Sequence, residues 1–206
     1  MDPLSLLGRP RADIPRTTVC SKTLFPGAHG ECLEEPLDGL SVHLGCGKKQ
    51  WDGWLNVDAF RGLSTVDLVC SVADLPTIAT GTAVRAAAIH VVEHFYRWEL
   101  EPLLLEWKRI LVPGGQLILE CPCMDKVFQY IRKTDPTTTN LEMQMTGWAF
   151  WGDPSYRDPA MMHKWGYVVL ELKKALEDAG YVEVQHEPPR YHKKSRDMRI
   201  TGRKPR

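Results

Sequence analysis

The sequence has no excess of either charge, since 26 lysines and arginines balance 26 aspartates and glutamates among 206 residues. A balanced chain presents no global field to a nucleic acid or a membrane surface, so we expect neither as a partner. The sequence also lacks a run of about 18 apolar residues, the length needed to span a bilayer. Its opening stretch, MDPLSLLGRPRADIPR, lacks the basic segment and apolar run of a secretory signal. We therefore expect a cytoplasmic protein without membrane insertion.

Closely spaced cysteines are scarce as well. Of the six cysteines, only Cys121 and Cys123 lie near each other, and one residue separates them where a zinc-binding pair usually has two or more. Isolated cysteines in an intracellular protein are mostly reduced and buried. The pattern therefore predicts free thiols and no metal site.

Five prolines and no sustained periodicity predict that residues 1–40 form an irregular N-terminal arm. Residues 41–206 are expected to form a single domain. Short apolar runs rich in β-branched and small residues recur there, in SVHLGC, WLNVDA, VDLVCSV, AAAIHVV and GQLILECP. Several are apolar on both faces, as strands between helical layers are, so we predict an α/β fold with a parallel sheet.

Two amphipathic helices are predicted among these strands. One lies in YRWELEPLLLEWKRILVPGG, where Pro113 to Gly115 stop it, and the other lies in YVVLELKKALEDAG, which stops at Gly180. Residues 134–165 are rich in Thr, Pro, Met and Trp without a clear period. Such an insertion is typical of a functional lid or binding loop, or of a disordered segment, and its three tryptophans favour order.

Glycines and carboxylates follow successive predicted strands. Gly45 and Gly47 come where the first strand ends, and glycine lets a ligand lie directly against the backbone. Asp58 ends the next strand, where a carboxylate accepts hydrogen bonds from both hydroxyls of a ribose. Asp74 and Leu75 follow the third, placed to meet the amine and ring of a base such as adenine. Each signal alone also fits a tight turn or a helix cap, so their order and spacing carry the interpretation.

The glycine pattern does not fit a dinucleotide as the ligand. The fingerprint Gly-x-Gly-x-x-Gly requires a third glycine where Gln50 stands, and Asp58 follows at less than the usual 20 or so residues. A nicotinamide-dependent reductase is therefore disfavoured, and a nucleoside ligand without phosphates fits better.

The motifs HLGCGKKQWDGWLNVD (43–58), VADLP (72–76), HVVEHF (90–95), RILVPGGQLILECP (109–122) and RDMRITGRK (196–204) resemble those of class I S-adenosylmethionine-dependent methyltransferases. They look most like a compact bacterial and phage-type branch. The resemblance covers roughly Val42 to Lys204. It implies a Rossmann-like, three-layer α/β/α fold with a seven-stranded sheet in the order 3-2-1-4-5-7-6 and the last strand antiparallel.

The resemblance further implies S-adenosylmethionine as cofactor. It places Gly45, Cys46 and Gly47 at the methionine part, Asp58 at the ribose, and Asp74 with Leu75 at the adenine. The sequence departs from the wider superfamily in having His43 where an acidic residue is common and Lys49 where a third glycine is common. The connection KKQWDGW also shortens the usual first helix, which affects the reach of Asp58.

Methyl transfer from a sulfonium needs alignment above all, and a base only if the acceptor loses a proton near attack. His90, at the end of the fourth strand, is expected near the cofactor's methyl group, either packing against the cofactor or acting as a base. His94 is a second candidate base, with helix capping as its alternative. His163, at the end of the insertion, is a third, with a surface position as its alternative.

Two further features bear on the acceptor. Trp148, Trp151 and Trp165 suit either an acceptor pocket or the anchoring of the insertion. From Arg190 onward, eight basic residues face one acidic residue. Such a segment would draw a phosphate-bearing acceptor, a nucleotide sugar for example, or a nucleic acid, or it is simply a solvated edge strand.

The sequence therefore favours an S-adenosylmethionine-dependent methyltransferase that acts on a small-molecule or sugar-like acceptor. A cofactor-binding module that senses or scaffolds without catalysis is the alternative, because the glycine motif is altered and no catalytic base is compelling.

Overall fold

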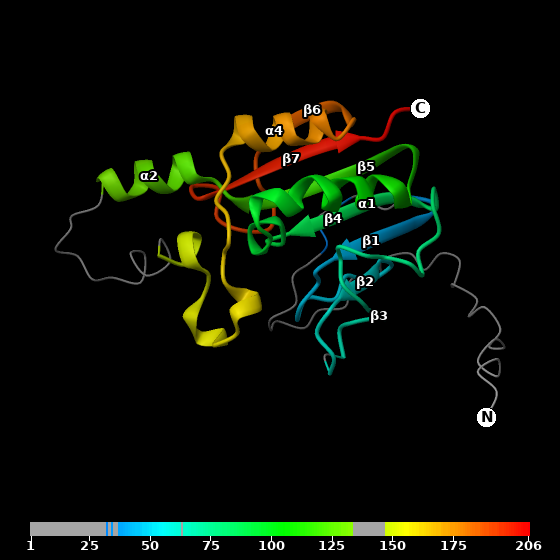
Figure 1. Cartoon of the computed structure of the whole chain (residues 1–206), viewed down its shortest axis with the longest axis horizontal. Coiled ribbons are helices and arrows are strands. Elements are labelled where there is room, and N and C mark those ends of the chain that lie inside the picture. Colours follow the sequence, from blue (N-terminus) through cyan, green and yellow to red (C-terminus); the bar gives the residue numbers. More distant parts are fainter. Residues whose placement is uncertain (1–31, 33, 35–36, 63, 134–146) are drawn as a thin grey trace.

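A computed structural model describes residues 32, 34, 37–62, 64–133 and 147–206 (Figure 1). Most of the predicted N-terminal arm, and the first part of the predicted insertion, lie outside the described residues. Among those described, no helix is long and apolar enough to cross a bilayer.

Seven strands form one sheet in the order β3-β2-β1-β4-β5-β7-β6. Strands β1 to β5 run parallel to one another, and β7 is antiparallel to both β5 and β6. The predicted order and the antiparallel last strand are confirmed. The strands are β1 (Leu40–Leu44), β2 (Leu55–Asp58), β3 (Leu68–Val69), β4 (Ala83–Ile89), β5 (Leu111–Pro122), β6 (Val182–Glu187) and β7 (Asp197–Arg203).

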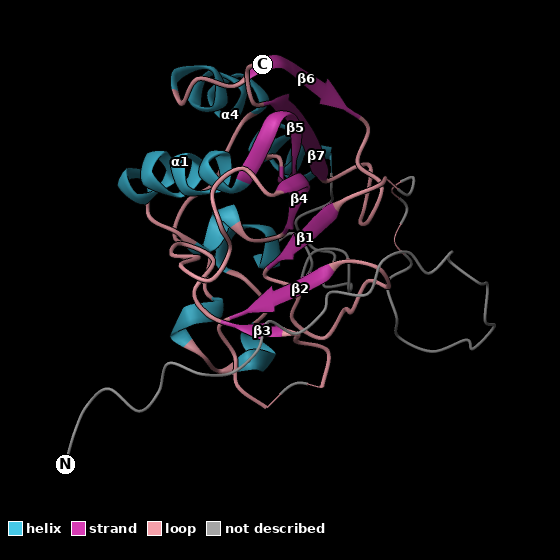
Figure 2. Cartoon of the chain, turned by 90° about the vertical axis from the view of Figure 1, so that its right-hand side faces the viewer, coloured by secondary structure: helices cyan, strands magenta, loops and turns pink. Residues whose placement is uncertain are grey.

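Helices α1 and α4 cover one face of the sheet, whereas α2 lies beyond the carboxyl ends of the strands (Figures 1 and 2). The helical elements are η1 (Val92–His94), η2 (Arg97–Glu99), α1 (Leu100–Ile110), α2 (Met124–Lys133), η3 (Pro154–Tyr156), η4 (Pro159–Met161) and α4 (Val169–Asp178). Residues 147–151 are also helical.

Helix α1 packs on the sheet as its apolar spacing predicts. Leu103, Leu104, Trp107 and Ile110 are all fully buried in the main core. Trp107 also donates a hydrogen bond of 2.8 Å from its indole nitrogen to the carbonyl of Val72, so that its polar atom is satisfied. The helix ends at Ile110, and Pro113 to Gly115, which the sequence predicts to stop it, lie within β5.

The opposite face is covered, among the described residues, by aromatic side chains from loops. Alternation along β4 and β5 turns Ala87 and Ile118 to this side, where they pack with Trp51. Trp54 and Tyr191 lie against the same cluster. A second small core thus holds the loops onto the sheet.

The connection from β1 to β2 consists of turns, so the first helix, which the sequence predicts to be shortened, does not form there. Asn56 organises it, because its side-chain oxygen accepts a hydrogen bond of 2.8 Å from the Trp51 N–H and its amide donates to the Trp51 carbonyl. His43 lies 3.3 Å from the same oxygen and stacks on the Trp51 indole, with ring centroids 3.7 Å apart. Burial lowers the pKa of His43 to about 4, and the Lys49 cation acts in the same direction.

The free energy of unfolding should therefore decrease as the pH falls, because the unfolded chain takes up a proton on His43 that the folded chain does not. Its pKa is about 4 in the folded chain against 6.5 for an ordinary histidine, so the unfolded chain binds the proton first as the pH falls. This histidine should remove about 3 kcal/mol from the free energy of unfolding between roughly pH 6.5 and pH 4. Urea unfolding across this range measures the slope, which should be shallower in His43→Gln. An unchanged slope would contradict the assignment.

Candidate active site

The glycine turn lies at the carboxyl end of β1 and is tied to β2. The N–H groups of Gly45 and Cys46 both donate to the carbonyl of Val57, at 2.8 and 3.1 Å. Gly45 has φ 68°, and a Cβ there would lie 2.6 Å from Cγ2 of Val91. Only glycine meets both conditions without strain.

Asp58 contacts this turn directly. One of its carboxylate oxygens accepts a hydrogen bond of 2.8 Å from the Gly47 N–H, and the other accepts one of 2.8 Å from the Phe60 N–H. Thr65 completes the arrangement by donating from its hydroxyl to the Gly47 carbonyl at 2.7 Å. A carboxylate has about four acceptor positions, so the half-buried Asp58 keeps capacity for ligand hydroxyls.

The other predicted cofactor residues, Asp74, Leu75 and Cys46, differ in how far they are buried. Asp74 is exposed in the turn that follows β3. Leu75 is fully buried in the main core, and its N–H already donates to the Glu106 carboxylate at 2.8 Å. Cys46 is buried, and burial, followed by the charges of Asp58 and Asp67, raises the pKa of its thiol to about 12. That thiol is therefore protonated and is not a nucleophile.

His90 follows β4 in a left-handed conformation, with φ 56°. Its Nδ1 lies 2.8 Å from an oxygen of Glu93, and its Nε2 lies 3.3 Å from an oxygen of Asp197. Burial alone would lower its pKa, but the two carboxylates together raise the pKa to about 9. The ring is therefore an imidazolium near neutral pH, which suits a positioning group better than a base.

Sequence reasoning missed the groups around His90. Asp197 also holds Arg196 at 2.6 and 2.9 Å, and these cations keep the pKa of Asp197 well below its usual range despite burial. His192 lies with its ring centroid 4.2 Å from that of His90, and its Nε2 is 3.1 Å from the Lys49 ammonium. Burial and the neighbouring cations lower the pKa of His192 to about 3. No local motif signals the contact between His90 and Asp197, because the pairing of β7 with β5 creates it.

His94 and His163 come together beside Glu93. Their rings meet edge to face, with centroids 4.9 Å apart, and His163 Nε2 lies 4.0 Å from a Glu93 oxygen. Hydrogen bonds from the backbone N–H groups of Lys164 and Trp165 to the Glu93 carbonyl, at 2.7 and 3.3 Å, hold the insertion there. Burial lowers the pKa of His163, so it is neutral at physiological pH. Two of the three candidate bases thus lie at one point, and His163 is not a surface residue.

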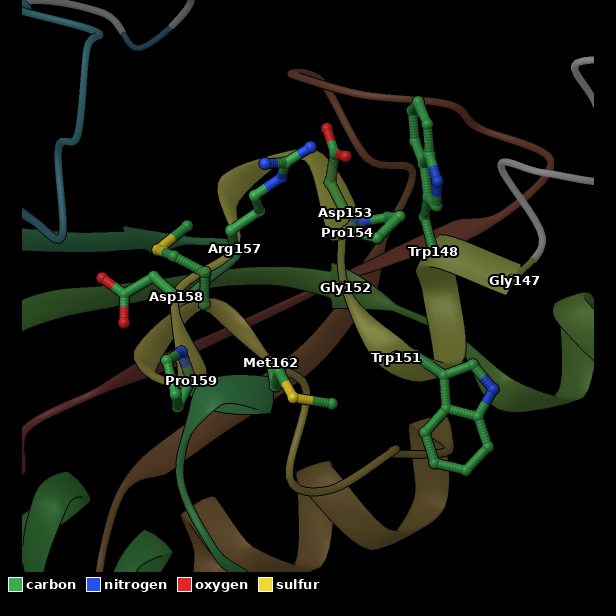
Figure 3. Close-up of a pocket in the computed structure, with 11 residues that line it drawn as sticks. Gly147, Trp148, Trp151, Gly152, Asp153, Pro154, Arg157, Asp158, Pro159 and Met162 are labelled. Carbon is green, nitrogen blue, oxygen red and sulfur yellow. The ribbon is translucent and has the colours of Figure 1, made fainter.

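A pocket of about 530 Å³ opens in the inserted segment (Figure 3). Trp148 and Trp151 line it, whereas Trp165 does not. Arg157 and Asp158 add charged groups to the wall. The segment approaches the glycine turn, since the Lys48 ammonium lies 6.0 Å from the centre of the Tyr156 ring. The pocket therefore lies on the same side of the molecule as the strand ends.

Half of the eight basic residues in the C-terminal segment form ion pairs within the fold. The guanidinium groups of Arg190, Arg196, Arg199 and Arg203 each form an ion pair with an acidic side chain. Most of these acidic residues lie before Arg190 in the sequence, so the count of charges from Arg190 onward does not include them. The segment therefore offers less free positive charge to a phosphate than its sequence suggests.

No family model matches the sequence, and no curated protein matches it. Many solved structures share its fold. They include a structure described as a possible exported protein from Bordetella parapertussis (14% identity, TM-score 0.54, covering 82% of this chain and 62% of that one). Human N-acetylserotonin methyltransferase in complex with S-adenosylmethionine is another (14% identity, TM-score 0.52, covering 82% of this chain and 48% of that one). A third is an S-adenosylmethionine-dependent methyltransferase from Archaeoglobus fulgidus (16% identity, TM-score 0.54, covering 81% of this chain and 86% of that one).

The chain thus spans less than two thirds of the first two of these proteins and most of the third. Its sheet order, its antiparallel β7 and these likenesses together define the Rossmann-like fold of class I S-adenosylmethionine-dependent methyltransferases.

Proposed function

We propose that the protein is an S-adenosylmethionine-dependent methyltransferase that acts on a small-molecule or sugar-like acceptor. The observation that supports this most is the hydrogen bond between Gly47 and Asp58, which joins the glycine turn to the predicted ribose carboxylate at adjacent strand ends. In an open α/β sheet, ligands bind in this position. The motifs also lead us to propose the compact bacterial and phage-type branch.

The cofactor's methionine part would lie against Gly45, Cys46 and Gly47, near His90. Its ribose would bind Asp58, and its adenine would lie by Asp74. The exposed Asp74 carboxylate is accessible to an amine. Leu75 would contribute through the turn that it anchors, because its side chain and N–H are engaged elsewhere.

The acceptor would enter from the pocket of the inserted segment. Attack by an acceptor lone pair forms the new bond to the methyl carbon while the bond from sulfur to that carbon breaks. The bonding electrons return to sulfur and leave S-adenosylhomocysteine. His163 is the base that we favour for any acceptor proton, because it is neutral and its Nε2 carries no proton when Nδ1 donates to the Ala149 carbonyl at 2.9 Å. His94 is the alternative.

Calorimetric titration with S-adenosylmethionine and S-adenosylhomocysteine tests the proposal, with NAD as the negative control. We expect micromolar binding of both sulfur ligands and none of NAD. Asp58→Asn should weaken binding at least tenfold, because the amide is a poorer acceptor for ribose hydroxyls. The exposed Asp52→Asn, in the adjacent loop, should bind like the parent chain. Failure to bind either sulfur ligand would overturn the proposal, and binding without turnover across acceptors would favour the sensing module.

We also propose a reducing, cytoplasmic setting. The five cysteines that the structure describes are all free thiols, and Cys46, Cys121 and Cys123 are buried. Free buried thiols are typical of that compartment.

A further inference from the structure

Three potential metal ligands converge between η1 and the end of the inserted segment. Glu93, His94 and His163 each offer a ligand atom, and these atoms all lie within 4.8 Å of one another. They come from positions 70 residues apart that the backbone contacts of Glu93 bring together. The grouping is therefore fixed by the fold.

Glu93 is the most demanding member of this group. It is 1% exposed, and one of its oxygens, Oε1, lies 2.8 Å from Nδ1 of the His90 imidazolium, which donates to it. Within the described part of the chain the other oxygen, Oε2, accepts no hydrogen bond. A buried carboxylate oxygen without a donor is costly, and a cation bound there would offset that cost.

The two histidines are oriented as metal ligands are. His163 donates from Nδ1 to the Ala149 carbonyl at 2.9 Å, and His94 places Nδ1 3.2 Å from the Met162 carbonyl. A carbonyl accepts only from a protonated nitrogen, so in the neutral form of each ring Nε2 has the free lone pair. Backbone carbonyls commonly fix metal-binding histidines in this tautomer.

A second group of possible ligands, His90, His192 and Asp197, suits a cation poorly. Arg196 already binds both oxygens of Asp197, and the Lys49 ammonium lies 3.1 Å from His192 Nε2. The cationic side chains of Arg196 and Lys49 thus already contact the ligand atoms that a metal ion would need.

We propose that Glu93, His94 and His163 bind one divalent transition-metal ion. A coordinated imidazole nitrogen cannot accept a proton, so the base role proposed for His163 or His94 applies only to the metal-free protein. Two imidazoles and one carboxylate form a donor set used for zinc and for iron(II). Bonds of about 2.1 Å place ligand atoms roughly 3 to 4 Å apart, so the side chains need to contract by about 1 Å around the ion. The spacing of the cysteines predicts no metal site, but this set of ligands contains no cysteine.

The site lies against the pocket wall. Gly152 lines the pocket, and a Cβ on it would lie 3.4 Å from the His163 ring. Three protein ligands leave positions on the ion for water or another oxygen donor.

Titration of the chelator-treated, tag-free full chain with Co²⁺ tests this site, with visible absorption as the readout and Zn²⁺ competition as the check. We expect one equivalent to bind, with Kd raised at least 30-fold in Glu93→Gln and in His163→Gln. His186→Gln, on β6, is a matched control and should bind like the parent chain. Circular dichroism shows whether each variant folds. If one of the two ligand variants does not fold, the other still tests the site.

Absence of a bound equivalent in the folded parent chain would overturn the proposal. So would loss of binding in His192→Gln together with retention in both ligand variants, because the ion would then occupy the other group. The titration contains no cofactor or acceptor and measures no turnover. Its failure is therefore distinct from failure of the proposed methyltransferase function.

Discussion

Replacement of Arg199 by methionine should lower the free energy of unfolding by about 3–5 kcal/mol. Arg199 is 1% exposed, and its guanidinium lies 2.9 Å from Glu120 and 2.8 Å from Glu34. Glu120 is completely buried and also accepts hydrogen bonds from the N–H groups of Arg190 and Tyr191. Removal of the cation would leave uncompensated buried carboxylates, whose desolvation is no longer offset.

Urea denaturation followed by circular dichroism measures this change. Arg203→Met is a matched control on the same strand, since its partner Glu183 is exposed and the pair should contribute at most about 1 kcal/mol. Removal of a facing charge in Arg199→Met/Glu120→Leu should recover part of the loss. Equal stability of the Arg199→Met and Arg203→Met variants would show that the buried network does not carry the energy assigned to it.

Gly45→Ala should destabilise the chain by about 2–4 kcal/mol, from left-handed backbone strain and overpacking together. The new Cβ would lie 2.6 Å from Val91, whose short, branched side chain has little freedom to move away. The turn can relieve the contact only by shifting, which would disturb the hydrogen bonds from Gly45 and Cys46 to the Val57 carbonyl. We therefore also expect the affinity for S-adenosylmethionine to fall at least tenfold.

Two variants separate the causes of this effect. Gly47→Ala has a similar φ of 51° but no atom within 4 Å of the added Cβ, so it should lose only about 1 kcal/mol of stability. Gly45→Ala/Val91→Ala removes the overlap and should regain part of the loss. Thermal and urea unfolding give the comparison. If Gly45→Ala were no worse than Gly47→Ala, close packing against Val91 would not be the reason for glycine.

The features that could be predicted from the sequence are those encoded by short segments. Buried strands, the helix in α1, and a glycine turn followed by a carboxylate each occupy fewer than about 20 residues, and their order is typical of one sheet topology. The sequence predicts a short β1 to β2 connection, but not that it lacks a helix altogether. Leu75 shows the limit of this reasoning, because a motif gives a residue's place in the chain but not which way its side chain points.

The remaining features depend on residues far apart in the chain. His90 and Asp197 are separated by 107 positions and meet only because β7 pairs with β5. Glu34 precedes the sheet yet binds Arg199 in its last strand. Each of these groups is an ordinary charged residue in its own segment, so neither spacing nor composition distinguishes it. The cluster of Glu93 with His94 and His163 has the same origin.

The position of β7 has a consequence for the order in which the chain can fold. This strand lies between β5 and β6, although it follows both in the sequence. While a ribosome is still releasing residues 197–203, β5 has an open edge and β6 lacks its neighbour, and an open edge is able to pair with strands of other molecules. Arrival of β7 closes that edge and delivers Asp197 to His90 in the same event. The same folding step therefore protects the chain from aggregation and forms the ion pair between His90 and Asp197.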